Sequence, residues 1–550
     1  MSASKRQFDV VVVGSGIGGL GAALTAARAG LSVLVLEAGK QFGGYTNPFK
    51  RGKFRFDPGL HYIGECGPGQ SLTRMLESLG LADEVRFREL SPDGFDRLVF
   101  PGYEIAMPRG ADRYRERLTR DFPHEERGLE RFFAVLAEFR ASIAAVGRVR
   151  DLRSALRVAR HVPFLVRHVR ATFADVIDPL VRDPLLRAVL AAQGGDYGLP
   201  PSRASALIGL GLLDHYLSGA YYPLGGSRAL RDAFVRGIEA HGGELRRNSP
   251  VDKIVVRGGR ARAVRVRGEE IAARLVVSNA DAVRTYRDLV GTEHLPFLLR
   301  RKTARTRQSV ASICLFMGTD LDVAAAGMTD ANIWAYPTVD LERAYAPLFE
   351  GRLPEGELFF LSSPSLKETG AGGHGATHGA PPGHHTLELV TLAPYEPFAQ
   401  WDGLKSMRRG AEYEALKREL ADRYLGCVER YVPGIREHLD VLEVATPVTN
   451  VTYAAAPRGA IYGPDAGPDQ MGPFRFPTRS PIGGLLLCGS STLGAGIVPS
   501  ALSGFQAGKQ AVAALRKGRA AHVVVPRVPE STAAPTGRAK APATPVELEP

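Results

Sequence analysis

The strongest constraint on the fold is the N-terminal segment Phe8–Glu37, which contains every part of a βαβ dinucleotide-binding unit in order. The apolar run Val10–Val13 predicts a strand that is buried on both faces of a parallel sheet. It leads into a G-x-G-x-x-G motif formed by Gly14, Gly16 and Gly19. Such glycines allow a tight turn, a close approach of the backbone to a pyrophosphate, and close packing of the helix on the strand.

The rest of this unit follows in register. Residues 20–29 predict a helix whose N-terminal amides point at the phosphates, and residues 31–36 predict the second strand. Glu37 stands at the end of that strand, where an acid can accept hydrogen bonds from the adenosine ribose. The alternative is a chance glycine-rich turn in another α/β fold, but the complete order of parts favours a dinucleotide. Neighbouring positions expected to contact it are Ser15, Gly18 and Ala38.

The segment after Glu37 indicates which dinucleotide is bound. The pattern Glu-Ala-x-x-x-x-Gly-Gly, ending at Gly43 and Gly44, resembles the FAD-binding start of the flavin amine oxidase and phytoene desaturase superfamily. The resemblance implies FAD as the cofactor, with the glycine pair and Tyr45 next to it. Many members of the superfamily carry an arginine where this chain has Tyr45.

Other segments narrow the resemblance. Residues 56–64, FDPGLHYIG, resemble the equivalent segment of retinol saturases and related carotenoid isomerases. Residues 222–227 and 241–244 resemble the return of that family to its FAD domain. The resemblance implies that residues 251–256 form a strand reaching the adenine, with Val251 in contact with the cofactor, and that residues 276–281 form a further strand.

The C-terminal part resembles the flavin motif of the same family. Residues 483–499 read as an apolar strand, a glycine-rich turn and the start of a helix. A helix N-terminus favours an electron-rich group, here the edge of the flavin. The contacts that the resemblance implies are Gly489, Ser490, Gly496, Ile497 and Val498. Cys488 is interpreted as a small apolar residue of the strand, so we expect non-covalent FAD.

The length of 550 residues predicts more than one domain. We expect an α/β fold with a Rossmann-like FAD-binding domain of the flavin amine oxidase and phytoene desaturase type and an inserted α+β substrate domain. The FAD-binding domain is expected in three pieces, residues 1–90, 215–290 and 440–520. The substrate domain is expected from residues 91–214, which read as helical, and 291–439, which read as mixed, with a disordered tail at residues 521–550.

The spacing of the cysteines and histidines does not predict a metal site. The four cysteines lack C-x-x-C spacing and fit a reducing compartment, so we expect a cytoplasmic protein without a signal peptide or membrane-spanning helix. The Gly/His/Pro-rich run Thr369–His385 could bind a metal, but it has no interleaved cysteine or acid beyond its histidines and is predicted to be a flexible loop.

The charge distribution indicates which kinds of partner the protein binds. The net charge is +12, and Arg150, Arg153, Arg157 and Arg160 recur on one face of a predicted amphipathic helix. Such a helix either lies in a membrane interface or presents a solvated, arginine-rich face. A lipid-soluble substrate favours peripheral association with a membrane. The chain shows no basic–aromatic interleaving or nucleic-acid-binding module, so we exclude nucleic acid. The oligomeric state has no signature in the sequence.

The resemblance implies a flavoenzyme that acts on an isoprenoid or other polyene lipid. Our first prediction is reduction or isomerisation of a carbon–carbon double bond, with NAD(P)H as a candidate external reductant, and the second is desaturation of a carotenoid precursor. An amine oxidase is disfavoured because Ser490 stands where many amine oxidases have an acid. A hypothesis of another class is a non-catalytic lipid-binding protein, as in the Rab escort proteins that share this architecture.

His61 and Tyr62 are the candidate catalytic residues, one as a proton donor and the other as a hydrogen-bonding partner of a terminal hydroxyl. The competing interpretation is that both pack the loop after the glycine pair. Asp57 is interpreted as a turn residue before Pro58.

Overall fold

The computed structural model describes residues 7–147, 162–354, 356–370, 377–406 and 408–520. The basic amphipathic helix predicted around residues 150–160 and the disordered tail predicted at residues 521–550 lie outside the described residues. No helix within the described part of the chain combines the length and the apolar character that a membrane span requires.

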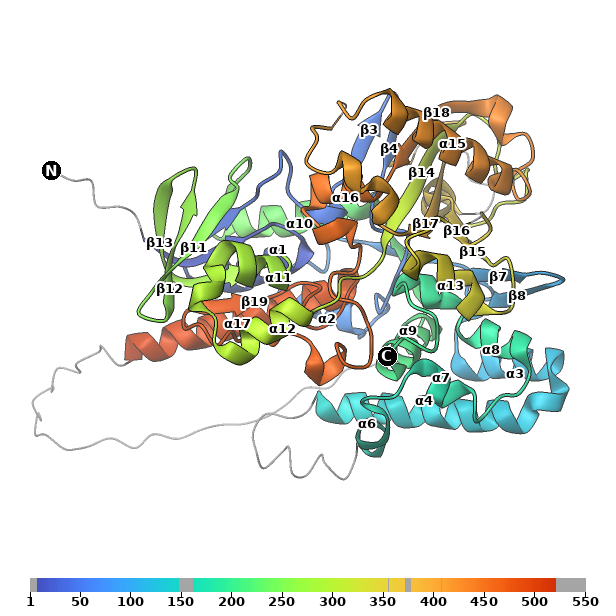
Figure 1. Ribbon diagram of the computed structural model, residues 1–550, viewed down its shortest axis with the longest axis horizontal. Helices are drawn as coiled ribbons and strands as arrows, with labels where there is room; N and C mark the ends of the chain where they lie inside the picture. Colours follow the sequence, from blue (N-terminus) through green and yellow to red (C-terminus); the bar gives the residue numbers. More distant parts are fainter. Residues whose placement is uncertain (1–6, 148–161, 355, 371–376, 407, 521–550) are drawn as a thin grey trace, which may run out of the picture.

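The first sheet is parallel at its centre and extends into an antiparallel ribbon on one side (Figure 1). Its parallel strands run in the order β10 (Glu244–Arg246), β2 (Val33–Leu36), β1 (Phe8–Val13), β13 (Glu269–Ser278) and β19 (Leu485–Leu487). The ribbon is made by the first half of β13 with β12 (Arg260–Val266) and β11 (Val251–Arg257). Every residue of β1 and β2 is buried, in agreement with the apolar runs. The strand predicted for residues 276–281 ends at Ser278, and Asn279 after it still donates its backbone N–H to the carbonyl oxygen of Val13 in β1.

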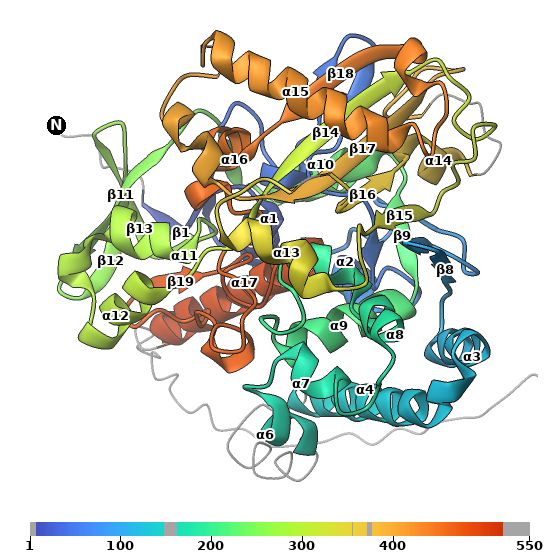
Figure 2. The same cartoon turned by 45° about the vertical axis from the view of Figure 1, so that its right-hand side comes forward.

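Two helices far apart in the sequence pack against each other beside this sheet (Figures 1 and 2). All residues of α1 (Ile17–Arg28) except Arg28 are buried, and α17 (Ile497–Ala520) lies along it. A Cβ on Gly504 would lie 1.9 Å from the carbonyl oxygen of Gly18, so the helices approach to backbone contact. This packing joins the N-terminal and C-terminal ends of the described chain in one layer.

The second sheet has seven strands and draws on both insertions. Its order is β18 (Leu439–Ala445), β14 (Ala311–Thr319), β17 (His385–Ala393), β16 (Phe359–Ser362), β15 (Asn332–Ala335), β7 (Asp96–Phe100) and β8 (Tyr103–Met107). Neighbours are antiparallel except β15 and β7. The prediction that residues 91–214 are helical is therefore wrong for the β7–β8 hairpin, which pairs with β15. Residues 440–445, predicted to belong to the FAD-binding domain, lie in the second sheet as part of β18.

Helices cover this second half of the molecule. α15 (Ala411–Val428) lies over the sheet, and its Tyr424 shares a buried cluster with Leu315 and Leu389 of the strands (Figure 2). The helices predicted for the first insertion are present in its other described parts. Its helices are α3 (Ala111–Asp121), α4 (Glu126–Val146), α6 (Pro163–His168), α7 (Phe173–Ile177), α8 (Pro184–Leu190) and α9 (Ala206–Leu217).

Further helices elsewhere in the chain are α2 (Ser71–Ser78), α11 (Ala282–Arg284), α12 (Phe297–Arg305), α13 (Leu341–Phe349), α14 (Pro364–Thr369) and α16 (Pro447–Ala454).

The segment after the second glycine motif connects the two sheets. The hairpin of β3 (Phe49–Arg51) and β4 (Phe54–Phe56) packs on the second sheet, with the rings of Phe56 and Phe316 5.7 Å apart. The chain then crosses back to a small sheet of β5 (Ile63–Gly64), β9 (Ala220–Pro223) and β6 (Phe87–Glu89), from which α10 (Gly226–Ala240) returns towards α1. The crossing, residues 57–62, carries the candidate catalytic residues.

Candidate active site

The turn between β1 and α1 is a cradle of backbone atoms with no room for side chains. A Cβ on Gly19 would lie 2.1 Å from the carbonyl oxygen of Gly14, and one on Gly16 would lie 2.7 Å from Nδ2 of Asn279. Asn279 follows β13, and its backbone N–H donates to the carbonyl oxygen of Val13 at 2.9 Å. Gly14 and Gly16 keep accessible surface. The N-terminus of α1 is therefore open to an anionic ligand, as a pyrophosphate site requires.

The predicted ribose acid lies directly beside this turn. One carboxylate oxygen of Glu37 accepts from the backbone N–H of Ser15 at 3.0 Å and from its hydroxyl at 2.5 Å, while the other accepts from the N–H of Gly39 at 2.7 Å. The Ser15 hydroxyl also accepts from the N–H of Gly43 at 3.1 Å. Ser15 thus ties together the phosphate turn, the acid and the second glycine motif.

The segment predicted to reach the adenine lies on the other side of the acid. The backbone N–H of Ser249 donates to the carbonyl oxygen of Glu37 at 2.7 Å, next to Ala38, and β11 begins two residues later at Val251. The contact is between backbone atoms, so its sequence signal is the position of the strand and not the identity of its side chains. The structure brings Val251, Glu37 and the phosphate turn to one edge of the first sheet.

The second glycine pair faces the same turn. Gly43 has a φ of +118°, and Gly44 next to it is exposed. The Tyr45 hydroxyl is buried without a hydrogen-bond partner among the described residues, and burial raises the pKa of this phenol. Arg231 approaches from α10: its Cδ lies 2.8 Å from where a Cβ on Gly43 would stand, and its guanidinium donates to Oδ1 of Asn47 at 3.1 Å. Sequence reasoning missed this cation, because α10 is far from the motif in sequence.

The C-terminal motif closes the site from the far side of Asn279. A Cβ on Gly489 would lie 2.7 Å from Oδ1 of Asn279, and the N–H of Gly489 donates to the hydroxyl of Ser503 at 2.9 Å. Gly496 is exposed just before α17 begins. The other predicted contacts in this turn and the first residues of α17 are Ser490, Ile497 and Val498. Asn279 therefore contacts both glycine-rich turns, a role that its place in the sequence does not reveal.

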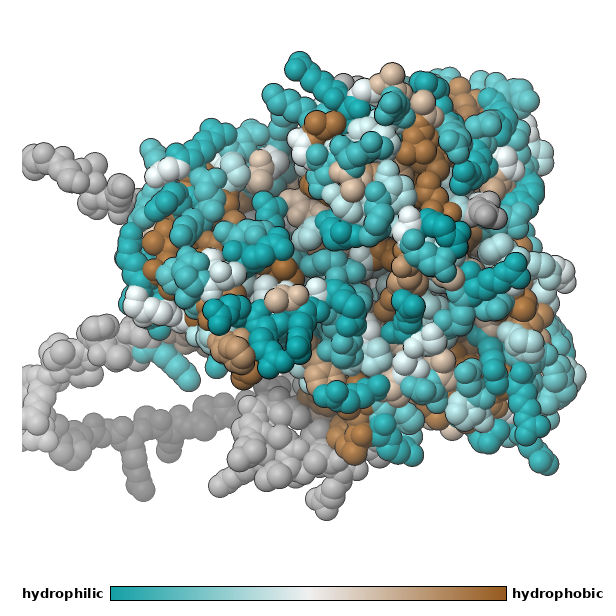
Figure 3. All heavy atoms as spheres, in the orientation of Figure 1, coloured by the Kyte–Doolittle hydropathy of each residue, from teal (hydrophilic) through white to brown (hydrophobic). Residues whose placement is uncertain are grey.

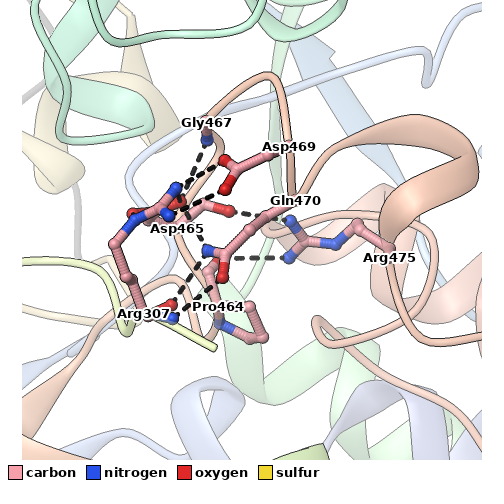
Figure 4. Close-up of polar contacts among 7 residues, drawn as sticks. All are labelled: Arg307, Pro464, Asp465, Gly467, Asp469, Gln470 and Arg475. Carbon is pink, nitrogen blue, oxygen red and sulfur yellow. Dashed lines mark hydrogen bonds and ion pairs between the residues drawn. The ribbon is translucent and has the colours of Figure 1, made fainter. Parts of the chain in front are cut away.

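A polar cluster around Arg475 contacts the C-terminal turn. Figure 4 shows the members of this cluster other than Ser490. The guanidinium of Arg475 donates to the carbonyl oxygens of Ser490 at 2.6 Å, Pro464 at 3.3 Å and Asp465 at 3.4 Å. Burial lowers the pKa of Arg475 to about 10. Arg307 pairs with the Asp465 carboxylate at 2.9 Å. The cluster fixes the loop that runs against the predicted flavin motif.

These residues fit an extended dinucleotide. Two helix N-termini, one acid and two glycine-rich turns converge within one layer, and Gly14, Gly16 and Gly496 in these turns keep accessible surface. The first sheet also agrees with the general rule that ligands of α/β folds bind outside the carboxyl ends of the strands.

Residues 57–62 enter a buried polar network with the second half of the molecule. One carboxylate oxygen of Asp57 accepts from the Tyr222 hydroxyl at 3.1 Å and the Ser227 N–H at 3.0 Å, and the other accepts from the Ser227 hydroxyl at 2.5 Å. The Asp57 N–H donates to Glu388 of β17 at 3.2 Å. Burial, followed by the charge of Glu388, raises the pKa of Asp57. Asp57 therefore anchors the start of α10 in addition to turning the chain.

The two candidate catalytic residues contact this network differently. His61 Nδ1 lies 2.9 Å from the buried carboxylate of Glu388, and the imidazole keeps 20% of its surface exposed. The Tyr62 hydroxyl donates to Oδ2 of Asp96 at 3.1 Å, and its ring stacks on that of Tyr216 with centroids 4.2 Å apart. The backbone of His61 is held as well, since the Lys367 ammonium donates to its carbonyl oxygen at 2.6 Å.

Lys367 and Asp96 form the centre of the network without touching each other. Asn332 links them: its amide donates to Asp96 at 2.7 Å and its carbonyl oxygen accepts from Lys367 at 2.5 Å. Gln193 donates to the other oxygen of Asp96 at 2.8 Å. Burial lowers the pKa of Lys367 to about 7 and raises the pKa of Asp96 to about 6. Sequence reasoning missed these groups, because each is an isolated polar residue within an otherwise apolar or unremarkable segment.

His374 of the predicted loop lies outside the described residues, and the described histidines of this loop have different partners. His384 Nε2 lies 2.7 Å from the ammonium of Lys53, and His385 begins β17 with its ring 3.2 Å from the Ser365 hydroxyl. Over the described parts of the chain, no cluster of three or more His, Cys, Asp and Glu side chains is arranged to hold a metal ion.

A Rossmann-like sheet whose two glycine turns and predicted ribose acid meet beside a second, mixed sheet is typical of a two-domain flavoprotein oxidoreductase. The chain belongs to the family described as flavin containing amine oxidoreductase, which matches residues 17–515. This membership makes the protein an FAD-dependent oxidoreductase and confirms both the predicted cofactor and the fold class.

Two relatives and one solved structure show which members of this family the chain is similar to. The chain is 29% identical to all-trans-retinol 13,14-reductase of Danio rerio over 84% of its own length and 78% of the relative. It is 26% identical to prolycopene isomerase 1, chloroplastic, of an Oncidium hybrid cultivar, over 91% of its length and 83% of the relative. A solved structure of putrescine oxidase bound to putrescine superposes with a TM-score of 0.59 at 16% identity, covering 92% of this chain and 99% of that one. The resemblance to retinol saturases and carotenoid isomerases is thereby confirmed.

Proposed function

We propose that this flavoenzyme reduces or isomerises a carbon–carbon double bond of a hydrophobic isoprenoid or polyene lipid. The observation that carries the proposal is the match, over more than three-quarters of each chain, to one relative named as a retinol reductase and another named as a prolycopene isomerase. Both names specify polyenes, and both reactions act on carbon–carbon double bonds.

FAD, when bound, supplies the transfer of hydride equivalents to or from carbon. In this proposal the N-terminus of α1 holds the pyrophosphate, Glu37 accepts from the ribose hydroxyls, and the backbone near Val251 faces the adenine. Gly43 and Gly44 on one side and residues 489–498 on the other flank the flavin. Each assignment rests on the convergence of these turns at Asn279 and Ser15.

His61 and Tyr62 are proposed to face the substrate side of the flavin. Both lie in the segment that leaves the second glycine motif, and both are positioned by buried carboxylates, Glu388 and Asp96. Fixed partners of this kind orient a side chain that must meet a reacting carbon. The network thus gives the loop a positioning function in addition to packing.

We also propose that the protein binds membrane surfaces peripherally through α12. Phe297 and Leu298 at its start are 60% and 76% exposed, and the exposed Arg300, Arg301 and Arg305 follow on the same helix. Figure 3 shows apolar side chains among hydrophilic ones along the lower edge of the molecule, where α12 lies in Figure 1. Apolar residues beside arginines suit an interface with anionic lipid, from which a lipid-soluble substrate would enter.

The test begins with the absorption spectrum of the purified protein and chromatographic identification of the released cofactor. Stoichiometric, non-covalent FAD is expected. The holoenzyme is then reduced under anaerobic conditions, with dithionite or NADPH, and incubated with all-trans-retinol, prolycopene or phytoene in detergent. A saturated or isomerised polyene supports the proposal. Loss of hydrogen from phytoene by the oxidised enzyme would instead support the desaturase hypothesis. A protein that binds polyene but fails to bind FAD would support the lipid-binding one.

A further inference from the structure

Asp196 is an acidic side chain that the function proposed above leaves without a role. It ends the short helix η3 (Ala192–Asp196), whose other described side chains are buried, but Asp196 itself keeps accessible surface. Its Oδ2 lies 3.5 Å from the Tyr62 hydroxyl, at the limit of a hydrogen bond. No lysine, arginine or histidine forms an ion pair with it within the described parts of the chain.

The segments on either side of Asp196 each lead to predicted flavin contacts. On one side is Tyr62, in the loop that follows Gly43 and Gly44. On the other side is Tyr462, whose hydroxyl donates to the carbonyl oxygen of Gly195 at 2.7 Å. The residue after Tyr462 touches the C-terminal motif, since a Cβ on Gly463 would lie 3.0 Å from the Ser490 hydroxyl.

Several residues in the segments around Asp196 keep accessible surface. Asp196, Tyr462, Gly463 and Ser490 are each half-buried, whereas the residues beside them in the sequence are mostly buried. Tyr45, next to the second glycine pair, is half-buried too. Partly accessible residues therefore occur both at the C-terminal motif and at Asp196, while Asp96 behind Tyr62 is fully buried.

The surroundings of Asp196 favour its protonated form. Burial raises its pKa to about 7, and repulsion from Asp96 adds to this effect, while hydrogen bonds from Tyr216 and Tyr62 oppose it. Asp96 differs because three neutral donors satisfy both of its oxygens. The ionisable groups around Asp196 are Tyr62, Asp96, Tyr197, Tyr216, Tyr336, Tyr345 and Tyr462. The Lys367 ammonium bonds Asn332, which in turn bonds Asp96, and it lies 5.6 Å from the ring centroid of Tyr62.

We propose that the carboxylic acid of Asp196 is the general acid that protonates the polyene carbon during reduction of the double bond. The inference rests on the proposed function, in which reduced FAD, when bound, would supply the hydride with its two electrons. The O–H bond of Asp196 breaks, and its proton forms a C–H bond at the alkene carbon that does not receive the hydride. The carboxylate then recovers a proton from water through its accessible side, and a nicotinamide or another two-electron donor restores the reduced cofactor. Tyr62 and Tyr216 hold the acid in place.

The decisive experiment combines turnover with a measurement on the protein alone. The chain variants are Asp196→Asn, Asp196→Glu and, as a matched surface control, Asp178→Asn, whose carboxylate is exposed and 3.5 Å from Arg187. Infrared difference spectra of the holoenzyme, without substrate, are recorded between pH 5 and pH 9. We expect a protonated-carboxyl component that titrates near pH 7 in the wild type, is absent in Asp196→Asn and is unchanged in Asp178→Asn, while the component of Asp96 near pH 6 remains in both variants.

In turnover by the pre-reduced enzyme, Asp196→Asn is expected to lose roughly 100-fold or more in rate while keeping its FAD content. Asp196→Glu should recover part of the rate. Because the acid must be protonated, the wild-type rate should fall as the pH rises through about 7, and this fall should be absent in Asp196→Asn.

Each remaining outcome is decisive. An Asp196→Asn enzyme with the wild-type rate and pH profile overturns the assignment of the acid and leaves the proposed function standing. A carboxyl component titrating near pH 7 that is lost in a fourth variant, Asp96→Asn, but persists in Asp196→Asn also overturns it, because the group protonated near pH 7 is then Asp96. If the wild-type holoenzyme converts no polyene, the proposed function fails and the inference fails with it.

Discussion

The two sheets of this molecule prepare their parts of the site in opposite ways. At the first sheet, the predicted cofactor contacts are mainly backbone groups, and short segments such as Gly14–Gly19 and Gly43–Gly44 place them locally. At the second sheet, the site is a network of buried side chains contributed by β7, β15, α14 and β17. Backbone recognition tolerates sequence change away from the glycines, whereas each member of the buried network depends on its partners.

Substitutions in the two regions should therefore have different effects. A change in a glycine turn should remove the cofactor and leave the second half folded. A change in the buried network should lower stability, because desolvated polar groups lose their hydrogen bonds.

The largest expected effect is on the cofactor side. Gly16→Val places a side chain where a Cβ already lies 2.7 Å from Nδ2 of Asn279, and it blocks the approach of a pyrophosphate. We expect FAD affinity to fall by about 100-fold or more, measured by flavin fluorescence after reconstitution. The control is Gly30→Asn, at a positive φ with open space, which should bind FAD normally. Unchanged affinity of Gly16→Val would show that the cofactor does not lie on this turn.

On the substrate side, Lys367→Met should chiefly change stability. The substitution leaves the carbonyl oxygens of His61 and Asn332 without a donor, at a cost of about 1–3 kcal/mol of unfolding free energy for each. Denaturant unfolding of the apo-protein measures this change, with Lys405→Met, an exposed lysine, as the control. A loss of FAD affinity without a loss of stability would contradict the contrast between the two regions.

The same lysine predicts a pH dependence. Its folded pKa of about 7 is below its unfolded value near 10.5, so the unfolded state binds more protons between these values. The contribution of Lys367 to stability should therefore increase as the pH rises from about 7 to about 10, and Lys367→Met should lack this increase. A pH-independent difference between wild type and variant would mean that the lysine titrates normally.

A smaller effect is expected at Glu37. Glu37→Gln keeps the size of the side chain but removes the charge that accepts from Ser15 and, in the proposed complex, from the ribose. Hydrogen bonds to charged groups contribute about 1.5–3 kcal/mol, so FAD affinity should fall by roughly tenfold or more. Titration calorimetry with FAD checks this, and an equal fall for FMN, which lacks the adenosine, would argue against a ribose contact.

The smallest effect per residue is expected at the surface of α12. Replacing Arg300 and Arg301 by Glu should weaken binding to vesicles of anionic lipid by about 1 kcal/mol or more per residue and leave FAD content unchanged. Vesicle cosedimentation at two salt concentrations measures it, with Arg430→Glu, on α15's side of the molecule, as the control. Equal binding by both variants would place the membrane contact elsewhere.

Much of the fold followed from local patterns, and the misses have a physical cause. β1, α1 and β2 were predictable because each part of the unit has its own signature within thirty residues or so of the next. The β7–β8 hairpin was missed although Pro101–Gly102 marks a turn between two apolar runs. Its pairing with β15, more than two hundred residues away, has no local signal.

The amino-acid sequence by itself determined the cofactor half of this protein: the order of strand, glycine turn, helix and acid, and with it the family and FAD. Such recognition uses backbone geometry, which short motifs encode. The tertiary structure decided which side chains face one another between the sheets. Asn279 contacts both glycine turns, Lys367 and Asp96 meet through Asn332, and Asp196 lies between Tyr62 and Tyr462. Burial shifts the pKa values of these acids and of the lysine only because distant segments enclose them. The chemistry of the region between the sheets therefore arises from packing and not from any motif.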